Sequence, residues 1–188
     1  MFDQQEIQKA VKSIINAIGE DSTRDGLTGT PERVAEMYSE IFSGLEKDPK
    51  EELAGGFEEG HREMVVLKDI PFYSMCEHHL LPFYGSAHVG YVPNTKGRVV
   101  GAGNLARVVE IIARRPQIQE RMTSQIADTI YKVLEPDGVG VVIQAEHLCM
   151  VMRGINKPGS SLTTSALRGT FRSKSETRAE FFFLLENK

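Results

Sequence analysis

Cysteine is scarce in this sequence, long apolar runs are missing and there is no excess of positive charge, and each absence excludes a class of protein. Two cysteines among 188 residues cannot form a disulfide scaffold, which favours a reducing compartment such as the cytoplasm. No apolar run approaches the roughly 20 residues that cross a bilayer, and residues 1–15 lack the basic and apolar regions of a secretory signal. The net charge of −4 argues against a protein that binds nucleic acid. We therefore expect a cytoplasmic protein whose partners include neither a membrane nor a nucleic acid.

What the sequence does contain is a composition typical of a soluble globular protein, with 40% hydrophobic and 26% charged residues. Its length suits one substantial domain with an appendage. Charge is unevenly distributed, because residues 1–63 carry 15 acids and 7 bases whereas residues 64–188 carry 11 acids and 15 bases. The bases gather in residues 96–121 and 153–178. Two interpretations of these basic clusters stay open: a small polyanionic ligand, or ordinary solvated faces.

Hydrophobic periodicity predicts a helical arm at the start of the chain. Apolar residues at helical spacing predict a helix over residues 7–18. Thr30 followed by Pro31 predicts the N-cap and the first turn of a second helix. A loop rich in glycine then separates this arm, residues 1–60, from a domain of residues 61–188.

The domain is predicted to mix strands and helices in blocks. Residues 64–91 have strand patterns, including the alternating stretch "FYGSAHVGYV". Residues 105–133 predict two helices with a break near Pro116. Residues 139–153 are apolar and β-branched for long enough to form one bent strand or two short ones, and the tail from Thr177 has a helical pattern. The sequence therefore predicts an α+β domain.

Cysteine and histidine lie close together at two places. Cys76 precedes the pair His78 and His79, and Cys149 follows His147 by two positions. Zinc in catalytic sites has three protein ligands and keeps a fourth position for water, so two cysteines and one histidine suffice. Spacing leaves the histidine open, because a tight turn favours His79 whereas an extended strand places Cys76 and His78 on one face. The alternative is two buried, inert cysteines beside ordinary polar histidines.

The second cysteine has further reactive neighbours. If residues 139–153 are extended, His147, Cys149 and Arg153 share one face of the strand, because side chains alternate. That face would combine an acid–base group, a thiolate and a cation.

The stretch "GAGNLA" from Gly101 to Ala106 matches the dinucleotide-binding pattern G-x-G-x-x-G/A, and Glu120 lies where a ribose-binding acid would stand. That acid should end a second parallel strand, however, and the region around Glu120 has a helical pattern. No alternating βαβ series surrounds it, so a Rossmann dehydrogenase is disfavoured. Two interpretations of the glycines remain: backbone amides that approach an anion at the helix start, or a plain turn.

Four stretches of the sequence closely resemble the GTP cyclohydrolase I family: "TPERVAEMYSEIFSGL", "FYSMCEHHLLPFYG", "ARRPQIQERMTSQIA" and "AEHLCMVMRGINKPGSSLTTSALRGTFR". The resemblance extends from Thr30 to Glu186. It implies the tunnelling fold, in which protomers share strands around a central channel and two pentamers stack into a homodecamer with active sites at subunit boundaries. It also implies conversion of GTP and water to 7,8-dihydroneopterin triphosphate and formate, with zinc as cofactor, as the first step of tetrahydrofolate or pterin biosynthesis.

The resemblance further implies roles for individual residues. Cys76, His79 and Cys149 match the zinc ligands, which selects the turn over the strand, and His78 and His147 match the catalytic histidines. The residues that match substrate-binding positions are Glu120 and Gln119 at the guanine ring, Arg107 and Arg153 at the triphosphate, and Arg33 from a neighbouring subunit.

Three positions depart from the family pattern. The substrate-binding positions Gly103 and Asn104 stand where the family usually has serine and lysine, and Glu36 stands where many relatives have lysine. A missing cation beside a triphosphate weakens binding, since each charge-assisted hydrogen bond contributes about 1.5–3 kcal/mol. Either Lys96, Arg98 or another basic residue compensates, or GTP binds poorly, or the preferred substrate differs.

Two other functions therefore stay open. One is a paralogue of the same fold that acts on another purine or pterin. The other is a zinc-stabilised oligomeric binding protein without catalysis, which would not need His78 and His147 beside the metal.

Overall fold

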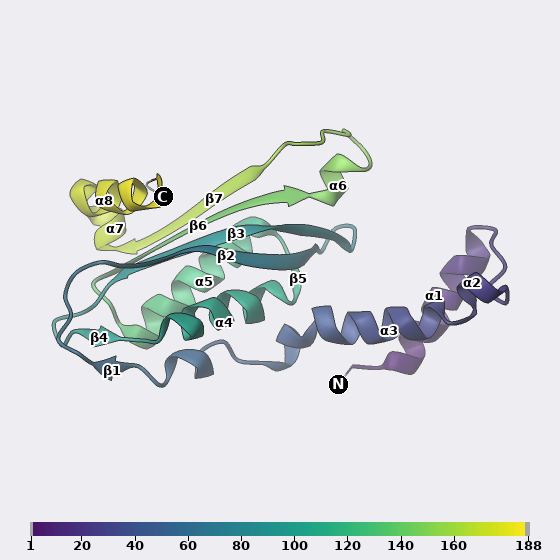
Figure 1. Ribbon diagram of the computed structural model, residues 1–188, viewed down its shortest axis with the longest axis horizontal. Coiled ribbons are helices and arrows are strands. Elements are labelled where there is room, and N and C mark those ends of the chain that lie inside the picture. Colours follow the sequence, from purple (N-terminus) through teal and green to yellow (C-terminus); the bar gives the residue numbers. More distant parts are fainter. Residues whose placement is uncertain (1, 187–188) are drawn as a thin grey trace.

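The computed structural model of the chain describes residues 2–186 and shows a curled sheet, two long helices against one face of it and a projecting helical arm (Figure 1). Within these residues the main sheet has five strands in the order β5-β2-β3-β6-β7. Neighbouring strands are antiparallel except β2 and β5, which are parallel. The strands are β2 Val65–Cys76, β3 Leu81–Val92, β5 Pro116–Gln117, β6 Gly138–His147 and β7 Leu162–Gly169. The architecture is α+β, as predicted.

The core lies between this sheet and the helices α4 Ala102–Ala113 and α5 Gln119–Leu134. The alternation predicted for β3 is confirmed, because Phe83, Val89 and Tyr91 are fully buried in this core. The helical residues that pack against them are Leu105, Val108, Ile112, Met122, Ile126 and Ile130. Both helices were thus predicted from their apolar spacing, and the break between them from Pro116.

The predicted extended run over residues 139–153 is wrong in its second half. β6 ends at His147, and Leu148–Val151 form one turn of helix, α6. The next strand, β7, lies further along the chain and was not predicted. Apolar periodicity cannot separate a run of four helical residues from the end of a strand. As a consequence, His147, Cys149 and Arg153 do not share the face of a strand.

The opposite face of the sheet is covered by α7 Thr170–Ser173 and α8 Ser175–Glu186, the helix that the tail pattern predicts. Phe171 and Phe181 are fully buried there, and their rings meet edge to face with centroids 5.2 Å apart. Gly90 and Gly140, which pair across β3 and β6, make room for the rings. A Cβ atom on either glycine would lie 2.6 Å from a ring atom, so only glycine permits this packing.

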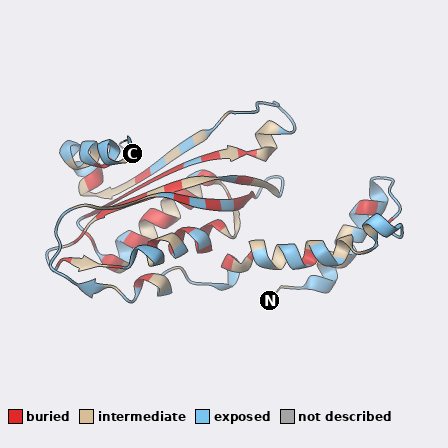
Figure 2. Cartoon of the chain, in the orientation of Figure 1, coloured by how far each residue is buried: buried red, intermediate tan, exposed pale blue. Residues whose placement is uncertain are grey.

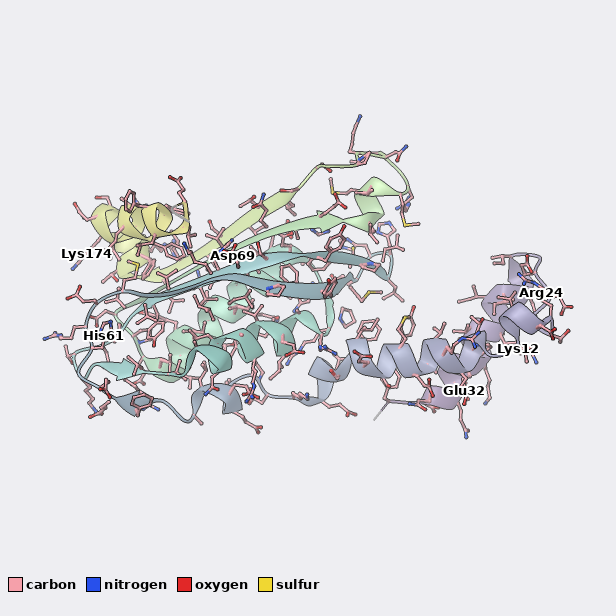
Figure 3. All side chains as sticks on the ribbon, in the orientation of Figure 1. Lys12, Arg24, Glu32, His61, Asp69 and Lys174 are labelled. Carbon is pink, nitrogen blue, oxygen red and sulfur yellow. The ribbon has the colours of Figure 1, made fainter. Side chains whose placement is uncertain are left out.

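The arm consists of α1 Gln4–Ala17, α2 Asp25–Thr28 and α3 Thr30–Ile41. Asp3 caps α1, because its carboxylate accepts a hydrogen bond from the Glu6 N–H at 3.0 Å. Gly29 precedes α3, so the predicted N-cap at Thr30 was one position late. The arm extends away from the sheet and is mostly exposed (Figure 2). Figure 3 labels three charged, exposed side chains on the arm: Lys12, Arg24 and Glu32.

Two 3-10 turns, η1 Ser43–Glu46 and η2 Glu51–Leu53, connect the arm to the body and pack against α4. Leu53 is fully buried in the core. A small second sheet pairs β1 Phe57–Glu58 with β4 Arg98–Val99.

The division into residues 1–60 and 61–188 stays a prediction. Within residues 2–186, no helix combines the length and apolar character needed to span a membrane.

Candidate functional site

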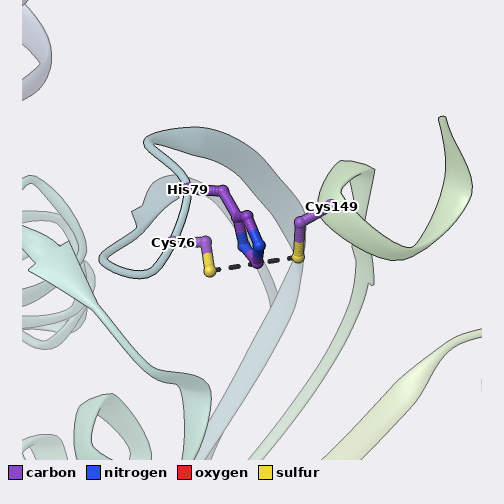
Figure 4. Close-up of side chains that lie close together, drawn as sticks. All are labelled: Cys76, His79 and Cys149. Carbon is purple, nitrogen blue, oxygen red and sulfur yellow. Dashed lines mark hydrogen bonds between the residues drawn. The ribbon is translucent and has the colours of Figure 1, made fainter. Parts of the chain in front are cut away.

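Cys76, His79 and Cys149 come together at one end of the sheet (Figure 4). Their candidate ligand atoms all lie within 4.8 Å of one another. The Sγ atoms of the two cysteines are 3.9 Å apart, and both cysteines are free thiols. Cys76 is buried, Cys149 half-buried and His79 exposed, so the cluster faces solvent on the histidine side.

The cluster has the chemistry and the dimensions of a zinc site. Sulfur and imidazole nitrogen bind zinc at about 2.3 Å and 2.0 Å. In a tetrahedron with that zinc–sulfur distance, two sulfurs lie about 3.8 Å apart, close to the 3.9 Å between Cys76 Sγ and Cys149 Sγ. Three donors leave one of four positions for water. The three side chains therefore fit a zinc ion with an open coordination position.

A tight turn between β2 and β3 positions two of these donors. Cys76 is the last residue of β2, and its carbonyl accepts hydrogen bonds from the N–H groups of His79 at 3.3 Å and Leu80 at 2.8 Å. Leu80 has a φ of 51°, the left-handed backbone that closes the turn. His78 is exposed and outside the cluster, and its ring meets the ring of His79 edge to face at 6.3 Å. The turn alternative is thus the geometry that this structure has.

Cys149 reaches the cluster from the single turn of α6. Burial raises the pKa of its thiol, and the nearby Cys76 raises it further. A thiolate at this position therefore needs a cation to stabilise it.

His147 lies beside the cluster as the last residue of β6. It is 9% exposed and stacks in parallel on the ring of Phe83, its partner in β3, with centroids 4.6 Å apart. Burial lowers the pKa of His147, and the charge of Glu120 partly opposes this effect. A neutral imidazole at neutral pH is suited to accept a proton.

Gln119 and Glu120 begin α5 and differ in their surroundings. Gln119 is 1% exposed, and its amide oxygen lies 2.8 Å from Nε2 of His147. Glu120 is exposed, so its carboxylate is available to a ligand. Arg153 is also exposed, and its guanidinium contacts Nε2 of His79, a contact that would give way if His79 bound a metal ion through that nitrogen. The structure thus places a carboxylate and a cation near the metal cluster.

The positions at the start of α4 lie away from the cluster in the same chain. The end of α4 is close to it, since the Ser74 hydroxyl donates to the Ala113 carbonyl at 2.7 Å. The residues just before α4 lie at the opposite end of the sheet. There the Val100 N–H donates to the hydroxyl of Tyr91, near the C-terminal end of β3, at 3.2 Å. A helix rises about 1.5 Å per residue, so the first turn of α4 is about 15 Å from its last.

One chain therefore assembles only part of the predicted site. Arg107 lies on α4 with its guanidinium 3.5 Å from the carboxylate of Glu52, and Arg33 lies in the first turn of α3, in the arm. The predicted residues that the chain brings together are Cys76, His79, Cys149, His147, Gln119, Glu120 and Arg153, and His78 lies on the same turn as His79. Those that it leaves apart from them are Gly103, Asn104, Arg107 and Arg33.

Sequence reasoning missed a pair that joins the turn to α5. Arg121 forms a bidentate ion pair with Glu77, with nitrogen–oxygen distances of 2.6 Å and 2.7 Å. Glu77 follows Cys76 directly, so this pair ties the turn to the helix that carries Glu120. Hydrogen bonding from Arg121 lowers the pKa of Glu77. The signal in the sequence was only the proximity of each residue to a motif position.

We expect Arg121→Gln to lower the melting temperature of the protein at neutral pH, with the difference from wild type shrinking as the pH falls below 4.5. The folded pKa of Glu77 is below its ordinary value of 4.5. Its ion pair therefore stabilises the fold above that value and is lost as the pH falls through the folded pKa. Thermal denaturation across this pH range measures the effect. Glu77→Gln should give the same profile, and a difference that stays constant with pH would contradict the assignment.

Comparison with known proteins supplies the family. The family model described as GTP cyclohydrolase I matches residues 7–186. The chain is 64% identical over 188 residues to the GTP cyclohydrolase 1 of Dehalococcoides mccartyi, with 100% of both chains covered. It is 62% identical over 188 residues to the GTP cyclohydrolase 1 of Pelotomaculum thermopropionicum, again with 100% of both covered. Among solved structures it is similar to the apo archaeosine synthase QueF-Like, at a TM-score of 0.45 and 18% identity over 56% of this chain and 93% of that one, too low a likeness to support a conclusion.

The family model and the full-length relatives agree with the fold. The curled antiparallel sheet with helices α4 and α5 on one face has the architecture of the tunnelling fold. The motifs quoted from the sequence also lie within the matched residues. On these grounds the chain belongs to the GTP cyclohydrolase I family.

Proposed function

We propose that this protein is a zinc-dependent GTP cyclohydrolase I that opens the imidazole ring of GTP at C8 and releases formate and 7,8-dihydroneopterin triphosphate. Membership of the family makes the chain a hydrolase of cyclic amidine C–N bonds. The observation that carries the finer proposal is the cluster of Cys76, His79 and Cys149 with the buried His147 beside it. A place at the start of tetrahydrofolate or pterin biosynthesis, in the cytoplasm, belongs to the same proposal.

Cys76, His79 and Cys149 would hold the zinc ion. Zinc with an open coordination position would lower the pKa of a water molecule there to about 7, which would supply a nucleophile at neutral pH. The role of the protein is to keep the fourth position free and to exclude further donors. Within the described residues, the cluster contains no fourth ligand from a cysteine, histidine or carboxylate.

His147 and His78 would transfer the protons of the reaction. Attack at C8 requires a group that removes a proton from the attacking water, and opening of the ring requires a proton on a ring nitrogen. His147 is suited to the first of these tasks, because burial keeps its imidazole neutral at neutral pH. His78 is exposed on the turn, where it would reach the substrate once the substrate is bound.

Glu120 would recognise the guanine ring. The N1–H and the 2-amino group of guanine form a pair of donors that a carboxylate can accept, and adenine does not offer this pair. With ATP in the site this carboxylate would face no such pair of donors and would lose its hydrogen bonds to the base, which disfavours ATP. Arg153, beside His79, would contact the triphosphate.

The residues that one chain leaves apart would come from a second copy. Gly103, Asn104 and Arg107 lie on α4 and Arg33 lies on the arm, so these residues would complete the site of a neighbouring subunit. An apolar groove of about 750 Å³ between α3, β2 and α4 is a surface where subunits would pack. This division of the site supports a homo-oligomer with shared active sites, and we propose the homodecamer of two stacked pentamers.

Incubation of the zinc-loaded protein with GTP tests the proposal. We expect equimolar formate and, after oxidation, the fluorescence of a pterin. ATP at the same concentration should give neither product, and zinc-stripped protein should regain activity when zinc is restored. Absence of both products from GTP under zinc-replete conditions would favour the two alternatives, a paralogue with another purine or pterin substrate or a binding protein without catalysis.

A further inference from the structure

Gln119 is a buried polar side chain whose amide nitrogen and oxygen both have hydrogen-bond partners. Its Nε2 donates to the carbonyl of Ile143 at 3.0 Å and to the carbonyl of Leu162 at 2.9 Å, and it lies 3.1 Å from Oγ1 of Thr164. Its Oε1 lies 2.8 Å from Nε2 of His147. With 1% of its surface exposed, this side chain joins β6, β7 and the histidine to the start of α5.

The two carbonyl partners determine which way the amide faces. A backbone carbonyl accepts hydrogen bonds and never donates them. Only the NH₂ end of the amide can therefore face Ile143 and Leu162, since the reverse orientation would place the amide oxygen against two carbonyl oxygens in a buried space. This argument depends on the chemistry of the partners and not on the positions of hydrogens. The end that faces His147 must then be the oxygen.

An amide oxygen in turn determines the proton of the histidine. Oε1 of Gln119 can only accept, so Nε2 of His147 must carry a proton to make the 2.8 Å contact. In the neutral imidazole the lone pair is then on Nδ1. The ring cannot turn over easily to exchange the two nitrogens, because it is buried and stacks on Phe83 with an interplanar angle of 0°.

We propose that Gln119 is a positioning residue that holds His147 in one tautomer, with the proton on Nε2 and the lone pair on Nδ1, so that Nδ1 is the atom that exchanges protons with the substrate. The proposal rests on the proposed function of His147. It replaces a direct contact of the Gln119 side chain with guanine, because both N–H groups of the amide are already engaged inside the protein. Guanine recognition then belongs to Glu120.

Gln119→Met removes the polar amide at nearly constant volume. We expect kcat to fall about 10- to 100-fold, the range found when an outer partner of a site histidine is lost, with KM changed less than about twofold. Gln117→Met is the matched control. Gln117 is 2% exposed, and its Nε2 donates to Ile112 and Gln125 without contact to a histidine, so kcat should stay near wild type although the fold loses similar hydrogen bonds.

A second comparison shows whether Gln119 acts through His147. In a His147→Ala background, Gln119→Met should lower the remaining kcat no further, because the residue it positions is gone. A rise in KM at unchanged kcat would show a substrate contact instead and would overturn the proposal. So would a loss of kcat that is equally large in the His147→Ala background.

The tautomer itself is measured without catalysis. Solid-state NMR of protein labelled with ¹⁵N-histidine, recorded above the ordinary histidine pKa of 6.5, should show for His147 a protonated Nε2 and an unprotonated Nδ1, with the resonances assigned by their loss in His147→Ala. A proton on Nδ1, or a mixture of tautomers in the wild type, would refute the inference. If the wild type releases no formate from GTP, the proposed function fails, and this measurement still decides the tautomer.

Discussion

Cys149→Ser is expected to remove the bound zinc together with the release of formate from GTP. Zinc prefers thiolate sulfur, and a serine hydroxyl stays protonated at neutral pH, so only Cys76 and His79 remain as ligands. The loss of an outer partner of a metal ligand already costs about 10- to 100-fold in affinity or activity, and the loss of a ligand should exceed this range. Metal analysis of the purified variant and the formate assay measure the two effects.

Met152→Ser is the matched control for this experiment. Met152 follows α6 at its C-terminal end and is 64% exposed, so the change removes a sulfur-bearing side chain close to Cys149 without removing a ligand. This variant should keep one zinc per chain and near-normal turnover. Full zinc occupancy in Cys149→Ser would show that the cluster is not the metal site, and the proposed mechanism would then be untenable.

The blocks of secondary structure could be predicted because their burial patterns are local. The alternation in β3 and the helical spacing in α4 and α5 each follow from a single stretch of sequence that packs on one core. The end of β6 could not be predicted, because "LCMV" fits either a strand or a helical turn. Its conformation depends on β3, whose pairing of Phe83 with His147 brings the following residues over Cys76.

The types of residue in the candidate metal cluster could be predicted, since cysteine near histidine at two places suggests zinc, but spacing left open whether His78 or His79 belongs to it. The role of Gln119 could not. Its partners Ile143 and Leu162 are 24 and 43 positions away, and they contribute backbone carbonyls, which every residue has. No composition or spacing marks such a contact. The same limit applies to Arg107 and Arg33, whose distance from the cluster is a property of the folded chain.

Zinc binding and proton transfer are separate tasks in the proposed mechanism, and His147 allows them to be distinguished. His147→Ala is expected to keep the zinc, because His147 is not among the three clustered ligands. Turnover should fall by about 100-fold or more, since a positioned acid–base group contributes about 10²- to 10⁴-fold. Zinc analysis and formate release from the same preparation measure both quantities.

Two further variants make this result specific. His147→Gln retains an N–H that can donate to Oε1 of Gln119 but has no group that titrates near neutral pH, so it should lose turnover as His147→Ala does. His88→Ala removes a different histidine, which lies on β3 and is partly buried, and whose Nδ1 accepts a hydrogen bond from the Asp69 N–H at 3.1 Å. This variant should leave turnover unchanged. Loss of zinc from His147→Ala would make this histidine a ligand, and normal turnover in His147→Gln would mean that hydrogen bonding to Gln119, and not proton transfer, is what the reaction requires of this position.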